Sequence, residues 1–388
     1  MSFLANDAVN RVNLQSGLQA LARGAGAVFL LVFLIKAGVT IPDAFLAQAA
    51  IVAGRFVIRP ILLPIAIRVG LKPVLLAGTV GLAAQYPLLA EVHGVGPMLV
   101  AMCAASAIGE VFYYVASNTY FAALGDVEHR GRQVAMNMAL AAIAGVIAPL
   151  AAGWSLVLAG PRWTFDAVAV VQLLSVIPLL PLPNIRVAAT APGAWAAARL
   201  SGLLILADGW FDGVSDYIWR VWLFVTLGQS YLAYGGAMAL AGVAGAAAGF
   251  IVGGHVDGGR GRRATLIGYS AAASVVILRA CSLHTPWLAG LANALGALAL
   301  PLLVPPLSAA THNMAKASPC PLRVKMTSEA GWDVGCFGAC LIAAALAWAH
   351  APPQLSILLA LPALAAGGAL LWRYYRPVTA ARSAQPLR

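Results

Sequence analysis

The sequence predicts an all-α membrane protein in which twelve transmembrane helices form two bundles of six. Three observations predict this fold. Hydrophobic residues make up 61% of the 388 residues and charged residues only 10%, a composition that soluble domains do not have. Apolar runs of about 20 residues, the length that spans a bilayer, recur along the chain. Basic residues gather in alternate loops, as they do in helical membrane proteins.

Charged residues, prolines and glycines separate the twelve predicted spans. The spans cover 17–37, 44–67, 72–91, 96–122, 133–158, 164–182, 200–227, 230–254, 264–283, 287–311, 327–349 and 354–374. The polar start of the chain runs into a full-length apolar span without a short apolar region and a cleavage site. We therefore expect no cleaved signal peptide.

The distribution of basic residues predicts the orientation. With the N-terminus in the cytoplasm, 17 of the 24 Lys and Arg residues fall in the tails and cytoplasmic loops, whereas only Lys36 and Arg162 fall in opposite loops. This bias places both termini in the cytoplasm, and the composition is typical of a bacterial inner (plasma) membrane protein. The net charge of +11 then indicates anionic lipid headgroups, not nucleic acid, as the partner of the basic loops.

The chain is also predicted to be internally duplicated. Six spans precede and six follow the segment PLPNIRVAATAPGAWAA, so we expect an N-terminal bundle at 1–182, a cytoplasmic linker at 183–199 and a C-terminal bundle at 200–388. Short basic loops containing glycine stand at matching places in the two parts, PIAIRVGLKPVLL at 64–76 and GGHVDGGRGRRATL at 253–266. Such pairs are what a duplicated unit leaves in a sequence.

Acidic residues inside two spans are the most informative feature for function. The seventh span carries Asp208, Asp212, Asp216 and Arg220 at four-residue spacing, and the eleventh repeats this spacing in Glu329 and Asp333. Helical geometry predicts a slowly turning stripe of these groups. Five acids facing lipid would cost roughly 12–17 kcal/mol, so the stripes must face water or each other. Ionisable residues in this position usually mark a solute or proton pathway.

Basic groups predominate inside the first six spans. Arg23, Arg55 and Arg59 lie in the first two spans, and Glu110, Tyr113 and Asn118 in the fourth. One wall of a central site would thus be basic and the other acidic. Structural alternatives remain for several of these residues: Arg23 can extend to the headgroups, Arg55 and Arg59 can pair with Glu110, and Glu329 and Asp333 can pair with Arg323 or Lys325. Arg279 is expected at the membrane interface.

Two loop and helix patterns resemble those of the major facilitator superfamily. The second basic loop is similar to the family's GxxxD(R/K)xG(R/K)(R/K) signature at Gly253, Asp257, Gly261, Arg262 and Arg263, with one additional residue. In the first loop, Pro64 and Arg68 replace the glycine and the acid. The fifth span reads GVIAPLAAG at 145–153, which resembles a weakened antiporter motif.

The resemblance implies two six-helix bundles that rock about a central site and expose it alternately to each side. It implies that the loop signature latches helices of the two bundles, and it favours antiport and efflux. No P-loop, HExxH or GxSxG motif occurs, so we expect no enzyme activity. The cysteines and histidines show no metal-binding spacing, and neither a metal nor another cofactor is expected.

The resulting hypothesis is a monomeric secondary transporter of a small charged or zwitterionic solute. A buried carboxyl that takes a proton on one side and releases it on the other suffices for coupling, and Asp212, Asp216 and Glu110 are the candidates. A sodium gradient is the alternative energy source. Two alternative functions are an importer of an organic anion held by Arg55, Arg59 and Arg23, and a non-transporting scaffold or receptor with permanently paired charges.

Overall fold

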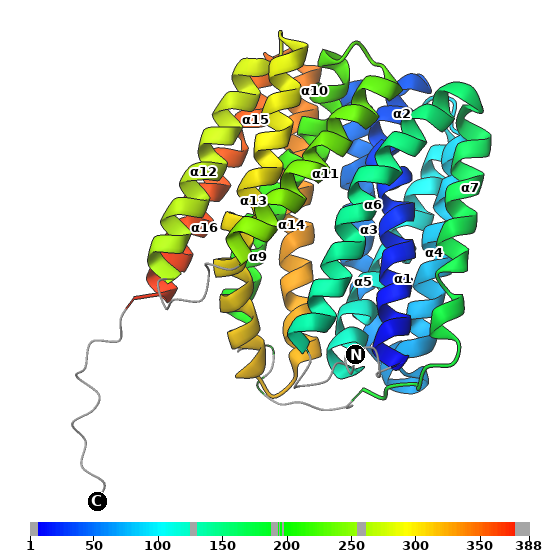
Figure 1. Cartoon of the computed structure of the whole chain (residues 1–388), viewed down its shortest axis with the longest axis vertical. Coiled ribbons are helices and arrows are strands. Elements are labelled where there is room, and N and C mark those ends of the chain that lie inside the picture. The colour runs from blue at the N-terminus through cyan, green and yellow to red at the C-terminus, as the bar shows by residue number, and fades with distance from the viewer. Residues whose placement is uncertain are drawn as a thin grey trace, which may run out of the picture.

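The computed structural model of the chain describes residues 7–124, 130–187, 193, 195, 198–253 and 261–376. All regular structure in these residues is helical, which confirms the predicted all-α class. Eleven helical segments are long and apolar enough to cross a membrane. The seventh predicted span is the twelfth segment, at 199–226, and consists of three shorter pieces. Figure 1 shows the long helices running side by side, with α1 beginning and α16 ending at the same end of the molecule.

The first six spans form what we call the N half. Its helices are α1 (Asp7–Ala25), η2 (Ala27–Phe29) and α2 (Leu30–Lys36) in the first span, then α3 (Ile41–Val69), α4 (Leu71–Ala90), α5 (Pro97–Leu124), α6 (Arg130–Leu158), and α7 (Gly160–Leu174) with η3 (Ile177–Leu179) in the sixth. Within the half, α4 packs on α5 and α7, and α1 packs on α6.

The last six spans form the C half. They comprise α9 (Arg199–Asp212), the π-helical segment η4 (Gly213–Ile218) and α10 (Trp219–Thr226) in the seventh, then α11 (Tyr231–Gly253), α12 (Gly261–Ser282), α13 (Pro286–Lys316), α14 (Pro321–Trp348), and α15 (Pro353–Leu358) with α16 (Ala360–Tyr374) in the twelfth. Here α9 packs closely on α14, and α12 on α13 and α16.

Several helices are longer than the predicted spans. The first begins at Asp7 instead of residue 17, and α14 begins at Pro321 instead of 327. The prediction located apolar residues, whereas a helix continues past the hydrocarbon layer for as long as its backbone hydrogen bonds are made. Turns set the remaining ends: Thr40 caps α3 by accepting a hydrogen bond from the Asp43 amide at 3.3 Å, and Gly70, at a φ of +87°, separates α3 from α4.

Two helix pairs join the halves along their length, α3 with α14 and α6 with α11. In the second pair, backbones touch at glycines of the GVIAPLAAG segment. A methyl group on Gly153 would collide with the Tyr231 carbonyl, and one on Gly242 would collide with the Gly145 carbonyl. Small residues at these positions allow the close approach of two membrane helices. The weakened antiporter motif therefore lies in the contact between the halves.

Aromatic residues close the contact between the halves at the end opposite the termini. The ring of Phe29 meets the ring of Tyr234 edge-on at 5.3 Å, and the Tyr234 hydroxyl donates a hydrogen bond to the Val28 carbonyl at 3.0 Å. Phe224 packs against both Tyr234 and Tyr231 at 5.7 Å. Phe29, Phe224 and Tyr234 are fully buried. We call this group the outer seal; it lies near α2 and α10 in Figure 1.

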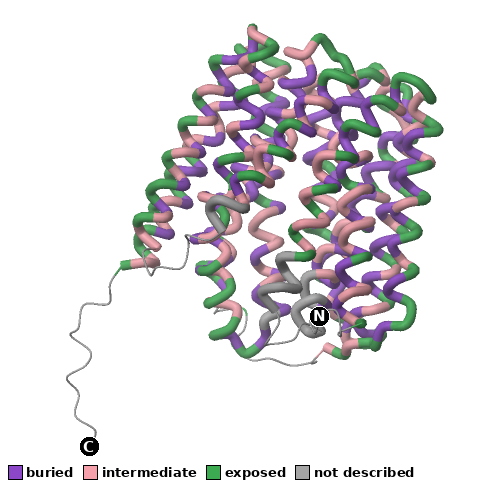
Figure 2. Tube along the Cα trace, viewed as in Figure 1, coloured by how far each residue is buried: buried purple, intermediate pink, exposed green. Residues whose placement is uncertain are grey.

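Apolar side chains cover much of the outside of the bundle. Trp163 and Leu158 in the N half, and Trp287 in the C half, are each more than 70% exposed. Figure 2 shows exposed residues along the outer helix faces and buried residues where helices meet. An apolar surface of this extent suits hydrocarbon and not water.

Candidate functional site

An ion-pair network connects the two halves near the middle of α3 and α14. Arg59 of α3 donates to the Asp333 carboxylate of α14 through both Nε and Nη2, with an Nε–Oδ2 distance of 3.1 Å. Arg55, one turn earlier, reaches the other Asp333 oxygen at 3.0 Å. The Asp333 side chain is completely buried. Because an uncompensated buried charge is very costly, these pairs hold the halves together in this conformation.

Three further residues extend the network. Arg55 donates to Glu110 of α5 at 2.6 Å and lies 3.6 Å from Glu329, which also pairs with Lys325 at 2.8 Å. Three basic and three acidic groups thus share one connected cluster, which is neutral when all six are ionised. The structure brings the predicted Arg55, Glu110 and Glu329 together.

The acid stripe of the seventh span lies next to this cluster. Asp216 pairs with Arg220 at 2.8 Å, and its side chain remains 38% exposed. Asp212 accepts a hydrogen bond from the Trp332 indole at 2.9 Å. Neither Asp208 nor Asp212 has an ion pair within the described part of the chain. The two acids lie on α9, as the four-residue spacing predicts. From Gly213 to Ile218 the span is π-helical, so the regular α-helical stripe does not continue to Asp216.

Glycines position α9 and its acids against α14. A methyl group on Gly209 would collide with the backbone of Trp332, and one on Gly335 would collide with the Leu206 carbonyl. The glycines of this span thus serve close packing and also mark a change in the helix. Gly209 allows close packing, and Gly213 begins the change from α- to π-helix. π-Helical turns are rare and occur frequently at functional sites.

Trp332 links the ion-pair network to the acid stripe. Its ring faces the Arg55 guanidinium at 4.8 Å, while its indole N–H donates to Asp212. The sequence showed a tryptophan near the acids but gave no means of distinguishing it from a packing residue. Its place immediately before Asp333 and three residues after Glu329 is the signal that could have identified it.

Arg23 is exposed although it lies within the first span. Its neighbours Ala22 and Gly24 are buried. The guanidinium lies 6.0 Å from the centre of the Tyr114 ring of α5, and no ion pair to it occurs among the described residues. Tyr114 lies one turn after Glu110 on α5, and Glu110 pairs with Arg55 in the network between the halves. Arg23 therefore lies on the N-half side of the network that joins the halves.

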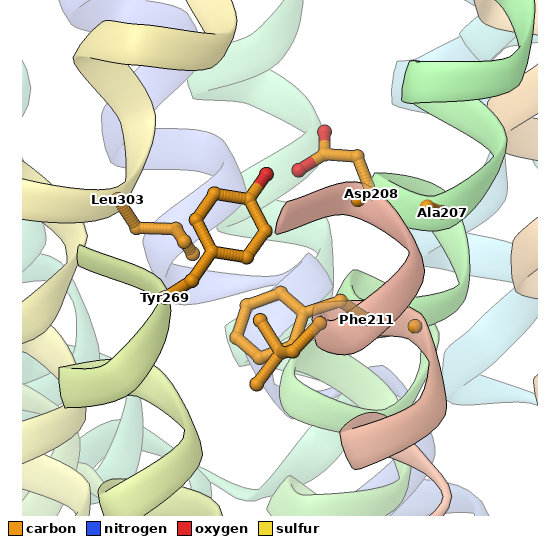
Figure 3. A pocket seen from close by; sticks show the side chains of 8 residues that line it. Ala207, Asp208, Phe211, Tyr269 and Leu303 are labelled. Carbon is orange, nitrogen blue, oxygen red and sulfur yellow. The ribbon is translucent and has the colours of Figure 1, made fainter. Parts of the chain in front are cut away.

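Asp208 lines a small cavity inside the C half. Figure 3 shows the Tyr269 ring between Leu303 and Asp208, with its hydroxyl directed towards the carboxylate. Phe211 and Gly367 complete this lining together with neighbouring residues of α9 and α16. The volume open to the centre of a water molecule is about 10 Å³, near the minimum that one water requires.

Two predicted residues, Tyr113 and Arg279, lie away from the ion-pair network. Tyr113 is 4% exposed and accepts a hydrogen bond from Gln15 at 3.0 Å, so it packs inside the N half, and its neighbour Tyr114 contacts Arg23 instead. The side chain of Asn118 lies outside the described residues. Arg279, which we expected at the interface, is buried against the Trp219 ring at 5.0 Å, within the C half. No group of three or more His, Cys, Asp or Glu side chains among the described residues is placed to hold a metal.

Comparison with known families identifies the architecture. Residues 14–319 match the model of the Major Facilitator Superfamily. The chain belongs to this superfamily. It therefore has the fold and family membership of a membrane transporter, as the loop signature implied.

Solved structures of superfamily transporters share the fold. The structure of the human organic anion transporter MFSD10 (TETRAN) superposes with a TM-score of 0.68 at 18% identity, covering 94% of this chain and 99% of that one. The nucleoside transporter NupG gives a TM-score of 0.70 at 13% identity, covering 95% of this chain and 100% of that one. No curated protein matches the chain by sequence.

The superfamily's loop signature is partly described. Arg262 donates to the Trp372 carbonyl at 3.3 Å and lies 4.1 Å from that ring, while Gly261 lies against Tyr375. These contacts join α12 to the end of α16 within the C half. Arg263 is exposed, and Gly253 is the last residue of α11. Asp257 lies outside the described residues, so the latch between the halves stays a prediction.

The degraded loop of the N half holds the start of the linker instead. Asn184 donates to the Val69 carbonyl at 2.7 Å and accepts from the Lys72 amide at 3.2 Å. The Lys72 ammonium donates to the Leu182 carbonyl at 2.8 Å. In the position where the superfamily signature has its acid, Arg68 accepts a hydrogen bond from Arg186 through its carbonyl at 3.0 Å. The first part of the linker is thus fixed to the N half.

Proposed function

We propose that this superfamily member is a proton-coupled secondary transporter of a small charged or zwitterionic solute. The observation that carries the proposal is the environment of Asp212. This carboxyl lies on an inner helix, accepts the Trp332 indole N–H and has no cationic partner within 4.0 Å among the described residues. A carboxyl so placed can bind a proton without breaking an ion pair, which makes it suited to coupling.

The cycle follows from the contacts between the halves. The outer seal and the Arg55–Arg59–Asp333 pairs lie at different depths of the same interface. Opening one side requires separating the rings of Phe29 and Tyr234, and opening the other requires separating Arg59 from Asp333. Proton binding at Asp212 would act on the second contact through Trp332, whose ring faces Arg55. Asp216 and Glu110 would also bind protons during the cycle, when they separate from their arginine partners Arg220 and Arg55.

Direction, energy source and location complete the proposal. The likeness of residues 145–153 to the antiporter motif favours antiport and efflux, driven by a proton gradient, with sodium as the alternative. The basic loops favour cytoplasmic termini in a plasma membrane, in contact with anionic headgroups. The transporter would act as a monomer and need no cofactor, and the absence of any catalytic motif favours transport over enzyme activity.

Two other functions have a specific observation in their favour. Import of an organic anion is favoured by the exposed guanidinium of Arg23, although Arg55 and Arg59 are engaged in ion pairs. A non-transporting scaffold is favoured by the closed, neutral network around Asp333. Against the scaffold, Arg23 and Asp212 are not part of that network, and this favours transport.

Reconstitution with a pH-sensitive dye tests the proposal. Purified protein in liposomes would receive pools of cationic, anionic and zwitterionic metabolites, and proton movement would be recorded. We expect one pool to move protons through the wild type and not through Asp212→Asn. The matched control is Asp7→Asn, because this acid is 75% exposed at the start of α1. Coupled transport by Asp212→Asn, or silence of folded wild type with every pool, would contradict the proposal.

A further inference from the structure

Most charged groups near the middle of the molecule are already paired. Arg55 and Arg59 hold Asp333 and Glu110, Lys325 holds Glu329, and Arg220 holds Asp216. Arginines locked in a buried, neutral cluster are poor ligands for a solute, because binding would leave a buried carboxylate without its partner. The charges available to a solute must therefore lie outside this cluster.

Arg23 and Asp212 are available charges of opposite sign on opposite halves. Arg23 is exposed on the first span of the N half, and Asp212 is partly exposed on α9 of the C half. They form no ion pair, so more than 4.0 Å separates their charged atoms, yet both lie beside the network of Arg55. Arg23 contacts Tyr114, one turn from Glu110 on α5, and Asp212 bonds to Trp332, whose ring faces Arg55. Arg279 and Asp208 also have no ion pair in the described residues, but both lie within the C half. Arg279 is buried against Trp219, and Asp208 lines the small cavity beside Tyr269.

Aromatic groups flank both charges. Tyr114 lies beneath the Arg23 guanidinium, and Trp332 fixes one oxygen of Asp212 through its indole N–H. These contacts orient the two groups without neutralising either. A fixed cation of the N half and a fixed anion of the C half thus flank the same ion-pair network.

From this geometry, and resting on the transport function proposed above, we infer that the solute is a zwitterion. Its anionic end pairs with Arg23 on the N half, and its cationic end pairs with Asp212 on the C half. A simple anion or cation would neutralise only one of the two groups and leave the other without a partner in a poorly solvated space. A zwitterion satisfies both, and it bridges the halves because its two ends contact different bundles.

The same assignment explains why proton and solute would exchange. Asp212 pairs with the cationic end only when it is ionised, and protonation removes that attraction. Proton and solute therefore compete for one carboxyl. Such competition gives antiport without a second coupling site.

Charge-matched probes test the assignment. Binding would be measured by the rise in melting temperature of the solubilised protein, and exchange by counterflow in liposomes without a proton gradient. One probe set would contain neutral amino acids, taurine, carnitine and glycine betaine. Derivatives would then remove one charge at a time from each amino acid: methyl esters are cations and N-acetyl derivatives are anions. We expect a zwitterion to bind at least tenfold more tightly than either of its derivatives.

Two variants assign the ends of the solute. Arg23→Gln should weaken binding of the zwitterion at least tenfold and leave binding of its methyl ester unchanged, since the ester has no anionic end to lose. Asp212→Asn should also weaken binding of the zwitterion. It should leave binding of the N-acetyl derivative unchanged, since that derivative has no cationic end. Arg162→Gln is the control and should behave as wild type, because this side chain is 78% exposed in the first turn of α7.

The outcomes separate this inference from the transport proposal. If a singly charged pool binds best, or if Arg23→Gln weakens all three charge forms equally, the zwitterion assignment is overturned while proton-coupled transport stands. If a zwitterion exchanges but never moves protons, the coupling proposal fails and the assignment stands. If no probe binds or exchanges in folded protein, both are rejected.

Discussion

The Trp332 indole N–H lies 2.9 Å from the Asp212 carboxylate, and this one hydrogen bond connects an acid of the seventh span to the helix that holds Asp333. Through its ring, the same side chain contacts the Arg55 guanidinium. Trp332 thus lies between the acid proposed to bind a proton and the ion pairs that close the halves. Its two contacts can be separated by mutation.

Trp332→Phe removes the hydrogen bond to Asp212 and keeps an aromatic ring near Arg55. A hydrogen bond to a charged group contributes about 1.5–3 kcal/mol, so we expect coupled transport to fall roughly tenfold to a hundredfold. Trp332→Leu removes both contacts and should lower the melting temperature as well. Equal transport by wild type and Trp332→Phe, measured by proton flux in liposomes over a range of pH, would refute a role for the indole N–H.

Arg59→Met should destabilise the protein because Asp333 stays buried and keeps only Arg55 as a partner. Breaking a buried ion pair costs about 3–5 kcal/mol, and we expect the lower end of this range. Replacing both partners, in Arg59→Met/Asp333→Leu, should recover most of the lost stability. Thermal unfolding of the two variants in detergent measures the difference. A double variant as unstable as Arg59→Met would show that the network contributes through some other contact.

Gly209→Ala should disrupt the packing of α9 on α14, because its methyl group would collide with the backbone of Trp332. We expect a loss of stability of about 1–3 kcal/mol from overpacking and a larger loss of transport. Gly236→Ala is the matched control, since its methyl group would meet open space on α11. The melting temperatures and counterflow rates of the two variants should therefore differ. Tolerance of alanine at 209 would mean that α9 and α14 can separate freely.

Phe29→Ala should weaken the outer seal and favour conformations open on that side. Removing a buried aromatic ring costs about 3–5 kcal/mol, and this loss falls on the closed form, in which the ring touches Tyr234. Spin labels at position 36, the end of α2, and at position 230, between α10 and α11, would report a longer distance in this variant. Tyr234→Phe, which loses only the hydrogen bond to Val28, should shift the distribution less. Unchanged distances in both variants would exclude the rings as a barrier.

Much of the fold could be predicted because segments that cross the hydrocarbon layer must be apolar. The number of spans, the charge asymmetry and the superfamily resemblance all depend on many residues together. An error in placing one residue therefore does not change them. Helix ends such as Asp7 and Pro321 were wrong because helices extend beyond the apolar layer.

The site was harder to predict because it depends on contacts between distant spans. Spacing placed Asp208 and Asp212 on one helix, but it could not say that Arg59 meets Asp333 or that Tyr114, not Tyr113, contacts Arg23. Nor does any propensity specify the π-helical turn that begins at Gly213 and packs on α14. A single sequence does not show which residues of distant spans are in contact.

The π-helical turn at Gly213 divides the seventh span into two parts that contact different neighbours. Below it, glycines hold α9 to α14, and above it α10 brings Phe224 to the outer seal. The backbone hydrogen bonds of a π-turn join residues five apart, whereas those of an α-helix join residues four apart. A change from one pattern to the other would rotate the part of the span that follows the turn. A rotation of the outer part about this turn would leave the Asp212–Trp332 hydrogen bond in place. It would change the orientation of Asp216 and Arg220 relative to Asp212.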